Sequence, residues 1–313
     1  MQSKLVLWLL CFPLCAQDAA IPATAEQAAE LRALVSKAPR LALELAEFAI
    51  HPPGAGWAVE MVSSVAVDSK GIIYLLQRGA KADPVIAVSR EGRVLRSWGA
   101  GMYKIPHSIR IDPAGNVWTV DAASSLVLKF TPEGKKLLEI QVGGQPASKD
   151  GFRGTTDIAF GPGGRLFISD GYGNARILEY TAEGKRVREW GTAGIGPGQF
   201  HVPHAIAIDE NRVLYVADRE NGRIQRFDLN GRYLGGWSNL GKTFSLKISG
   251  GALYIGTQPR NEPNGAKGWL MKVDRKSGKI LGYVESAGHH SVEILANGNL
   301  MTGSRPDRVL WFR

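Results

Sequence analysis

The chain has 313 residues, 44% of them hydrophobic, and carries a formal net charge of +9 with a pI near 9.6. This length and composition are those of a single-domain protein. The basic residues are scattered along the chain without a basic run, so we expect a basic surface that favours anionic substrates and no nucleic-acid binding. The sequence also contains no glycine-rich phosphate loop and no nucleophile elbow.

The N-terminus has the pattern of a signal peptide over residues 1–16. Lys4 precedes an apolar stretch at 5–15, and Ala16 is a small residue suited to cleavage. The stretch is too short for a membrane span with these flanks. Both cysteines lie inside this segment, so the mature protein would contain none and no disulfide chemistry is expected. We therefore expect an exported protein, either periplasmic or secreted.

Residues 17–57 are expected to hold a short helix and a strand. The helix is predicted at 25–38, because Thr24 and Gln27 have the spacing of a capping box and Pro39 follows its end. The segment 45–50 is apolar enough for a strand. The last repeat of the chain ends after three strands, so this strand is a candidate to complete it and remove an exposed edge.

Residues 58–313 contain six copies of one internal repeat. Each copy has an alternating apolar run, a Gly- or Asn-containing turn, a second β-rich run and two further runs joined by a glycine turn. The copies recur at about 40 to 49 residues, the period of propeller blades. The sequence therefore predicts an all-β fold, a six-bladed β-propeller. The repeats align at Val67, Ile111, Phe160, Ile208, Ile248 and Ile294.

Three histidines share one register of this repeat. His107, His204 and His290 fall in the second, fourth and sixth copies, whose first strands should line the channel about 120° apart. Three imidazoles with an open fourth position are typical of a catalytic zinc site. The alternative is three independent channel histidines, each bonded to backbone. His289 is a second candidate for the third ligand, although the register favours His290. The intervening copies carry Ser63, Thr156 and Phe244 at this position.

A second group of residues is predicted at the ends of the second strands. Arg78, Arg219 and Arg305 occupy nearly the same position of their copies, and Tyr172 lies one step further along in the third. Arginines at a channel rim can clamp a carboxylate through two hydrogen bonds. A tyrosine near zinc and a guanidinium can act as a base. The alternative is that these are ordinary surface arginines and a turn aromatic.

Several segments resemble the NHL-repeat propeller of peptidyl-α-hydroxyglycine α-amidating lyase, over roughly residues 60–313. The resemblance implies that His107, His204 and His290 bind a catalytic zinc, that Arg78 and Arg219 bind substrate and that Tyr172 is the active-site tyrosine. It also implies a structural calcium held by the backbone carbonyls of Val65 and Ile109. The segments that carry the resemblance are 103–107, 169–177, 200–204 and 216–225, of which the run at 218–225 is the most specific.

The sequence departs from this family at the predicted calcium site. Ser291 stands where the family has a carboxylate, and losing an anionic oxygen should weaken a site for a hard cation. Gly288 replaces a methionine of the family near the third histidine, and Gly173 and Tyr215 replace two of its disulfide cysteines. We therefore expect zinc, with calcium bound weakly or not at all.

Two functions are consistent with these observations. The first, implied by the resemblance, is a zinc lyase that cleaves the N–C bond of a carbinolamide, in a small molecule or peptide, to give an amide and glyoxylate. The second is a non-catalytic NHL-repeat propeller that binds a ligand or protein on its rim. The aligned histidines favour the lyase, because a scaffold has no need of three imidazoles at one height. We expect a monomer without a membrane span.

Overall fold

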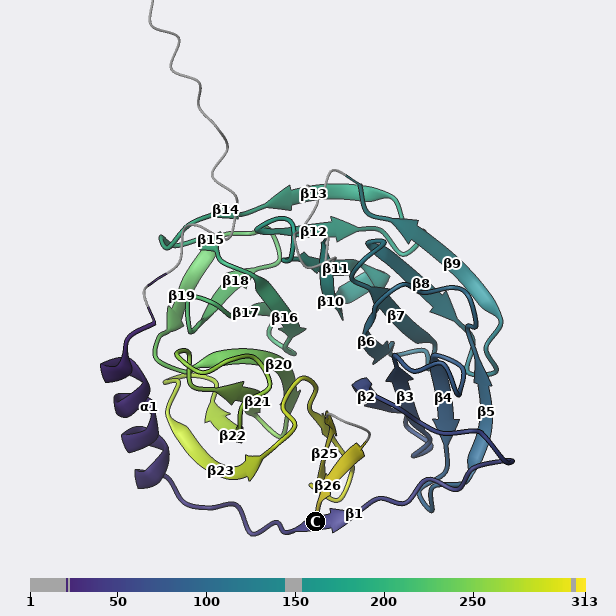
Figure 1. Ribbon diagram of the computed structural model, residues 1–313. Coiled ribbons are helices and arrows are strands. Elements are labelled where there is room, and N and C mark those ends of the chain that lie inside the picture. Colours follow the sequence, from purple (N-terminus) through teal and green to yellow (C-terminus); the bar gives the residue numbers. More distant parts are fainter. Residues whose placement is uncertain (1–20, 22, 144–153, 305–307) are drawn as a thin grey trace, which may run out of the picture.

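The computed structural model describes residues 21, 23–143, 154–304 and 308–313. The described residues form six four-stranded sheets and one α-helix. Figure 1 shows the sheets arranged as blades around a central axis, with the helix on the outside. The six-bladed β-propeller predicted from the repeats is confirmed, as is the N-terminal helix. The expected signal peptide at 1–16 lies outside the described residues. Among the described residues, no helix is both long and apolar enough to span a bilayer.

The strands follow the order of the repeats, innermost strand first in each blade. The first three blades consist of β2 (Val62–Val67), β3 (Ile73–Gln77), β4 (Val85–Val88) and β5 (Val94–Trp98); β6 (Pro106–Ile111), β7 (Val117–Asp121), β8 (Leu126–Phe130) and β9 (Lys136–Gln141); and β10 (Thr155–Phe160), β11 (Leu166–Asp170), β12 (Arg176–Tyr180) and β13 (Arg186–Trp190). A 3₁₀ turn, η1 (Pro162–Gly164), joins β10 to β11.

The other three blades have the same antiparallel order. They consist of β16 (Pro203–Ile208), β17 (Val213–Asp218), β18 (Arg223–Asp228) and β19 (Tyr233–Trp237); β20 (Lys242–Ser249), β21 (Ala252–Gln258), β22 (Gly268–Asp274) and β23 (Ile280–Ser286); and β24 (Glu293–Ile294), β25 (Leu300–Ser304), β26 (Arg308–Phe312) and β1 (Leu45–Glu47). A short parallel pair, β14 (Thr192–Ala193) and β15 (Gln199–Phe200), lies between blades three and four.

In the first two blades, an aspartate and a glycine build the turn after the first strand. In the second blade, Asp112 Oδ1 accepts hydrogen bonds from the amides of Ala114 and Asn116, at 3.0 and 2.8 Å. Gly115 between them has a φ of +86°, a conformation that glycine adopts without strain. Asp68 and Asp209 accept equivalent amide bonds in the first and fourth blades. The repeated signal in the sequence is therefore a turn that fixes where the innermost strand ends.

The core lies between neighbouring blades. Tyr74 of the first blade is buried in one cluster with Ile109 and Phe130 of the second. Burying a side chain of this size contributes roughly 1.5–3 kcal/mol. Each blade thus depends on its neighbour for its apolar cover, which holds the innermost strands at fixed positions around the axis.

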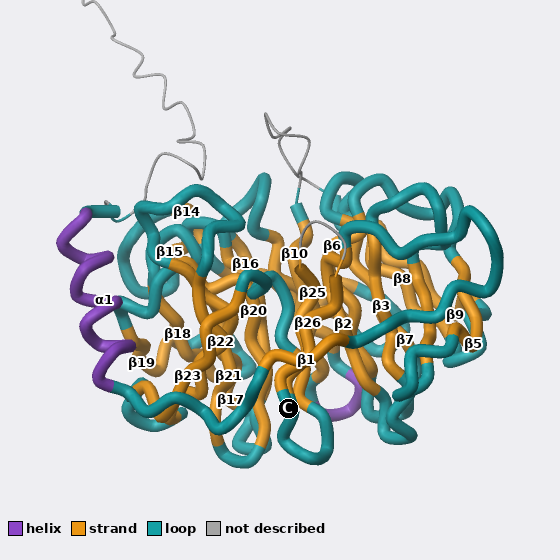
Figure 2. The backbone as a smooth tube through the Cα atoms, turned by 60° about the horizontal axis from the view of Figure 1, so that its bottom comes forward, coloured by secondary structure: helices purple, strands orange, loops and turns teal. Residues whose placement is uncertain are grey.

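The N-terminal segment closes the ring. Strand β1 pairs antiparallel with β26, with Leu45 opposite Phe312, and supplies the fourth strand of the sixth blade. This strand falls within the segment 45–50 that the sequence indicated, and it covers an edge that would otherwise be exposed. Figure 2 shows the chain running along the outside of the ring from α1 to β1.

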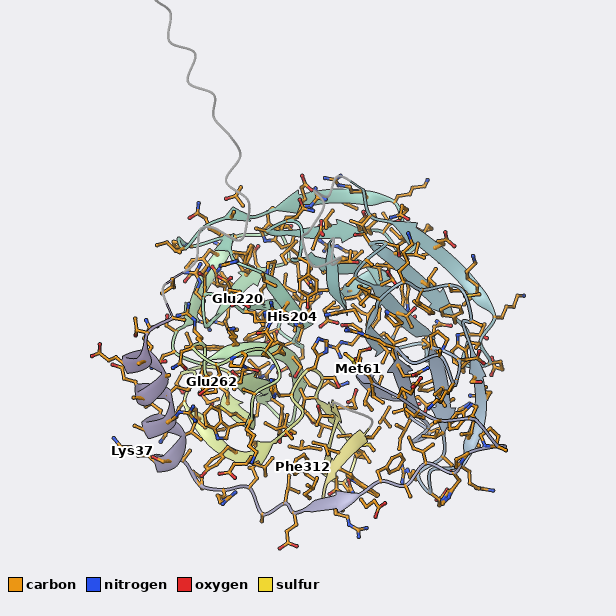
Figure 3. The ribbon with its side chains drawn as sticks, in the orientation of Figure 1. Lys37, Met61, His204, Glu220, Glu262 and Phe312 are labelled. Carbon is orange, nitrogen blue, oxygen red and sulfur yellow. The ribbon has the colours of Figure 1, made fainter. Side chains whose placement is uncertain are left out.

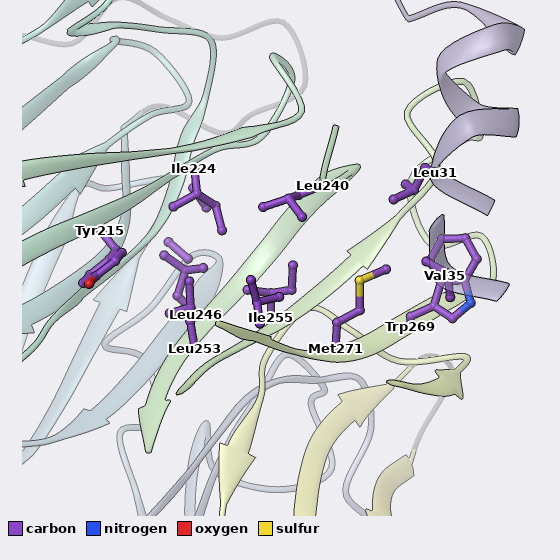
Figure 4. Packing of buried hydrophobic residues seen from close by; sticks show 13 residues of the cluster. Leu31, Val35, Tyr215, Ile224, Leu240, Leu246, Leu253, Ile255, Trp269 and Met271 are labelled. Carbon is purple, nitrogen blue, oxygen red and sulfur yellow. The ribbon is translucent and has the colours of Figure 1, made fainter. Parts of the chain in front are cut away.

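The helix α1 (Ala25–Lys37) is anchored to the fifth blade. Thr24 Oγ1 accepts from the amide of Gln27 at 3.1 Å, so the predicted capping box is present, and the helix ends one residue earlier than expected. Leu31 and Val35 are buried in one cluster with Trp269 and other side chains of the fifth blade, as Figure 4 shows. The helix therefore adds apolar cover to the outer side of the propeller.

Candidate metal centre and substrate site

A β-bulge marks the register that the histidines share. In five blades the pairing of the innermost strand with the next strand skips one residue, and bulges of this kind re-aim a side chain. In the sixth blade, β24 begins three residues after His290. At the bulge, one residue of the innermost strand has no partner in the pairing with the next strand. The skipped residues are Ser63, His107, Thr156, His204 and Phe244.

The three predicted histidines converge on the axis of the ring. One ring nitrogen from each of His107, His204 and His290 lies within 4.8 Å of the other two. The ring centroids are separated by 4.7 to 5.1 Å, and the rings meet edge to face. Figure 3 shows His204 near the centre of the ring of blades. Among the described residues, these three form the single cluster of histidine, cysteine or acidic side chains that could hold a metal ion.

Backbone carbonyls of the intervening blades orient all three imidazoles. A carbonyl oxygen accepts only, so each Nδ1 must carry the ring proton and each Nε2 presents its lone pair. A metal-binding histidine usually has this second hydrogen bond, which fixes the tautomer and the ring orientation. The Nδ1 atoms of His107, His204 and His290 lie 2.6, 2.7 and 2.8 Å from the carbonyl oxygens of Thr156, Phe244 and Ser63.

Burial keeps these imidazoles neutral. Burial is the largest cause that lowers the pKa of His107 and of His204, and nearby guanidinium groups and imidazoles lower it further. The pKa of His290 falls to about 3, through burial first and then through the charge of Arg78. Neutral imidazole is the form that ligates a metal, so the cluster is ready for a cation at neutral pH.

Tyr172 lies directly over this cluster. Its hydroxyl oxygen is 2.8 Å from Nε2 of His204 and 3.1 Å from Nε2 of His107. The hydroxyl has one proton, which satisfies one of the three converging lone pairs. A cation would satisfy them together, and three imidazole nitrogens suit Zn²⁺. The donor set therefore fits the metal that the sequence predicts.

His289 points elsewhere. Its Nε2 lies 2.9 Å from Oε1 of Gln258, at the end of β21, and its ring packs against Phe244 at 4.9 Å between centroids. The backbone carbonyl of His289 accepts from the hydroxyl of Ser245 at 3.0 Å. Of the two adjacent histidines, the structure brings His290 and not His289 into the cluster.

The two predicted arginines flank the cluster from different blades. Arg219 follows β17 and is buried, with Nη1 at 3.4 Å from the hydroxyl of Tyr172. Its guanidinium lies over the rings of Tyr172 and Phe244, at 5.5 and 5.1 Å from their centroids. Arg78 follows β3, and its Nε donates to the carbonyl of Pro106 at 2.8 Å. Arg305, the third arginine of the sequence pattern, lies outside the described residues.

A cavity adjoins Arg78. It has a volume of about 610 Å³ and is lined by side chains of the first two blades, among them Trp57, Tyr103 and Lys104. Arg78 and Pro106 belong to the same lining. Arg78 and the residue that directly precedes His107 therefore both line this cavity.

The predicted calcium site has no carboxylate at the position of Ser291. The hydroxyl of Ser291 is buried and accepts from the amide of Gly303 at 3.1 Å. Val65 and Ile109 are fully buried on the innermost strands β2 and β6. Weak calcium binding stays a prediction.

Sequence reasoning missed Glu220 and Gln258. Glu220 pairs with Arg219 at 2.8 Å, and Gln258 holds His289 away from the cluster. The signal for Glu220 was its place in the run 218–225, directly after a predicted site arginine. Gln258 gave a weaker signal, because it ends the second strand of its blade where three other blades have an aspartate.

Comparisons with known proteins agree with the fold. The profile of a family described as a 6-bladed beta-propeller matches residues 156–300. Peptidyl-alpha-hydroxyglycine alpha-amidating lyase 1 of Drosophila melanogaster is 36% identical over 190 residues, which is 55% of this chain and 35% of that protein. A probable lyase of the same name from Caenorhabditis elegans is 29% identical over 248 residues, 73% of this chain and 69% of that protein.

Longer relatives also match. Peptidyl-glycine alpha-amidating monooxygenase of Mus musculus is 35% identical over 213 residues, and the match spans 58% of this chain but 22% of that protein. The solved structure of a streptogramin B lyase has a TM-score of 0.59 at 15% identity, covering 87% of this chain and 97% of that one, which supports the fold. The resemblance drawn from the sequence is confirmed: the chain is similar to proteins named peptidyl-alpha-hydroxyglycine alpha-amidating lyase, and its described residues form a six-bladed β-propeller.

Proposed function

We propose that this protein is a zinc-dependent carbon–nitrogen lyase that cleaves a carbinolamide, R–CO–NH–CH(OH)–COO⁻, to the amide R–CO–NH₂ and glyoxylate. The observation that carries the proposal is the convergence of three imidazoles, each oriented by a backbone carbonyl, beneath the hydroxyl of Tyr172. Lyase-named relatives at 29 to 36% identity support the same reaction class.

The chain's residues divide the work of this reaction. A bound Zn²⁺ would act as a Lewis acid toward the substrate's α-hydroxyl group. Tyr172, in its phenolate form, removes the hydroxyl proton and later passes it to the leaving nitrogen, since its oxygen lies at the imidazole cluster and within reach of a guanidinium. The C=O bond of glyoxylate forms as the C–N bond breaks, and the nitrogen takes up the proton. No other co-reactant is needed, because atoms and charge balance.

The arginines hold the carboxylate of the substrate. Arg219 contacts Tyr172, and Arg78 is bonded to the residue before His107, so both guanidinium groups lie beside the reacting centre. A guanidinium pairs with a carboxylate through parallel hydrogen bonds, which fixes the orientation of the α-carbon. We also propose export, on the basis of the apolar segment at 5–15.

The test is release of glyoxylate by the purified protein supplied with zinc. N-acetyl-α-hydroxyglycine and homologues with larger acyl groups are offered as substrates, and glyoxylate is measured against the spontaneous rate. We expect release well above that rate for at least one acyl group. Release at the spontaneous rate with every acyl group would refute the lyase and leave the binding propeller as the better account.

A further inference from the structure

Glu220 holds one edge of the Arg219 guanidinium. Its Oε1 lies 2.8 Å from Nε of Arg219, and both side chains are largely buried, at 20% and 7% exposed. The bond uses Nε and leaves the two terminal nitrogens for other partners. One of them, Nη1, lies 3.4 Å from the Tyr172 hydroxyl. The carboxylate therefore determines which edge of the guanidinium faces the imidazole cluster.

Glu220 is itself fixed from three sides. Its second carboxylate oxygen is 3.6 Å from Nζ of Lys242, at the start of β20 in the next blade. Its amide donates to the carbonyl of His201 at 3.0 Å, and its own carbonyl accepts from Nε of Arg260 at 3.0 Å. Glu220 is thus held in place by backbone hydrogen bonds and by a neighbouring blade. Its side chain is therefore preorganised to orient the guanidinium of Arg219.

The charges favour a permanent pair. Burial alone would raise the pKa of Glu220, but the charges of Arg219 and Lys242 outweigh burial and hold that pKa below its ordinary value. The guanidinium is also confined by the rings of Phe244 and Tyr172, at 5.1 and 5.5 Å from their centroids. Its plane is therefore bounded by aromatic faces, while Glu220 fixes its rotation within that space.

We propose that Glu220 is a positioning residue, which turns the terminal nitrogens of Arg219 toward the substrate's carboxylate and thereby sets the affinity for carboxylate-bearing ligands. This proposal rests on the proposed lyase function, which identifies the ligand as a carboxylate-bearing substrate. The chemistry it requires is a carboxylate next to an N-acyl nitrogen. Without Glu220, the buried guanidinium loses its partner at Nε and can rotate away from the cluster.

The test measures binding of N-acetylglycine to the zinc-loaded, full-length protein by calorimetry. This probe has the acyl group and the carboxylate but no α-hydroxyl, so its binding requires no turnover. We expect Glu220→Ala to weaken binding at least about tenfold, or about 1.4 kcal/mol, with zinc content unchanged. Glu220→Gln keeps an acceptor for Nε and should stay within about threefold of wild type. Glu220→Asp keeps the charge but withdraws the oxygen by one methylene, so it should weaken binding as alanine does.

Two further variants separate positioning from general stability. In an Arg219→Ala background, Glu220→Ala should cause no additional loss of affinity, because its effect passes through Arg219. Glu179→Ala is the matched control, since Glu179 is buried and contacts Nε of Arg165 at 2.7 Å outside the site. That variant should bind N-acetylglycine as wild type does.

The outcomes distinguish this proposal from the lyase proposal. Wild-type affinity in Glu220→Ala or in Glu220→Asp would overturn the positioning role, as would a full additional loss in the Arg219→Ala background. Failure of the wild type to bind N-acetylglycine would overturn it too. Binding that depends on Arg219 and Glu220, without any glyoxylate release, would refute the lyase and leave the positioning role intact. If the alanine variant fails to fold, the Asp and Gln variants decide the question.

Discussion

The Nδ1 atom of His107 lies 2.6 Å from the carbonyl oxygen of Thr156, the residue at the same repeat register in the next blade. His204 and His290 repeat this relationship with the following blades. Alternate blades thus supply an imidazole and the blades between them supply the acceptor that orients it. The alternative was three independent histidines, each bonded to backbone. The backbone bonds are present, but the rings are not independent, because these bonds direct the three Nε2 atoms to one point.

The metal-free protein should lose stability as the pH falls below about 6.5, the ordinary value for histidine. The folded-state pKa of His289 is lowered to about 4 by burial, so between these values the unfolded chain binds a proton that the folded chain does not. The stability that the neutral His289 ring contributes is fully present above its pKa in the unfolded chain. It is lost as the pH falls toward its pKa in the folded chain. The expected slope is about 1.4 kcal/mol per pH unit for each such histidine.

Urea unfolding in the presence of a chelator, at several pH values between 7.5 and 4.5, measures this slope. His289→Gln should flatten it, whereas His51→Gln, at an exposed position, should leave it unchanged. Equal slopes in the wild type and His289→Gln would show that burial of this ring does not govern the acid sensitivity.

Tyr172→Phe should lower kcat by about 10² to 10⁴ while zinc content stays at the wild-type level. The phenol oxygen lies within 3.1 Å of two ring nitrogens and, when ionised, is the proton acceptor of the proposed reaction, whereas the ring itself packs against the imidazoles. Steady-state kinetics with parallel metal analysis is the measurement. A change confined to KM would assign Tyr172 to substrate binding instead.

Leu31→Ala should destabilise the propeller by about 2–5 kcal/mol, because Leu31 is 1% exposed in the cluster between α1 and the fifth blade. Leu34 lies on the same helix at 48% exposed, so Leu34→Ala is the matched control and should change stability by less than about 0.5 kcal/mol. Denaturant unfolding gives both values. Zinc content per folded molecule should be unchanged in both variants, and a loss of zinc in Leu31→Ala would show that the helix supports the metal centre directly.

Selective removal of calcium should leave the wild-type melting temperature unchanged, since Ser291 offers no carboxylate and its hydroxyl is bonded to Gly303. The Ser291→Asp variant should gain stability when calcium is added. Thermal unfolding with and without added calcium measures both effects. A marked drop in the wild-type melting temperature on calcium removal would mean that the backbone carbonyls of Val65 and Ile109 can bind calcium without a carboxylate.

The repeat made much of the fold predictable. A turn that begins with an aspartate follows the innermost strand in the first, second and fourth blades, and the alignment at Ile111 and Ile208 matched the ends of β6 and β16. The histidine register followed from the same alignment. The carbonyl acceptors could not be predicted, because they depend on a bulge and on backbone groups that carry no side-chain signal.

Contacts between segments that are distant in the chain could not be predicted from the sequence either. His290 and not His289 lies in the cluster, and the ring of His289 instead contacts Gln258, a residue 31 positions away in the chain. The support of Arg219 by Glu220 depends on the direction of a side chain within a loop, which residue type and spacing do not specify. Site residues were therefore predictable where the register of the repeat determines their position. They were not predictable where an individual contact between side chains determines it.

The most direct measurement is a zinc titration of the metal-free protein, with glyoxylate release from N-acetyl-α-hydroxyglycine followed in the same samples. The account predicts that release rises in proportion to zinc and stops at one equivalent per chain. His107→Ala, His204→Ala and His290→Ala should each abolish tight binding and release, whereas His289→Ala should retain both. Release without zinc, or normal zinc binding in any two of the three cluster variants, would contradict a single metal centre built from these histidines.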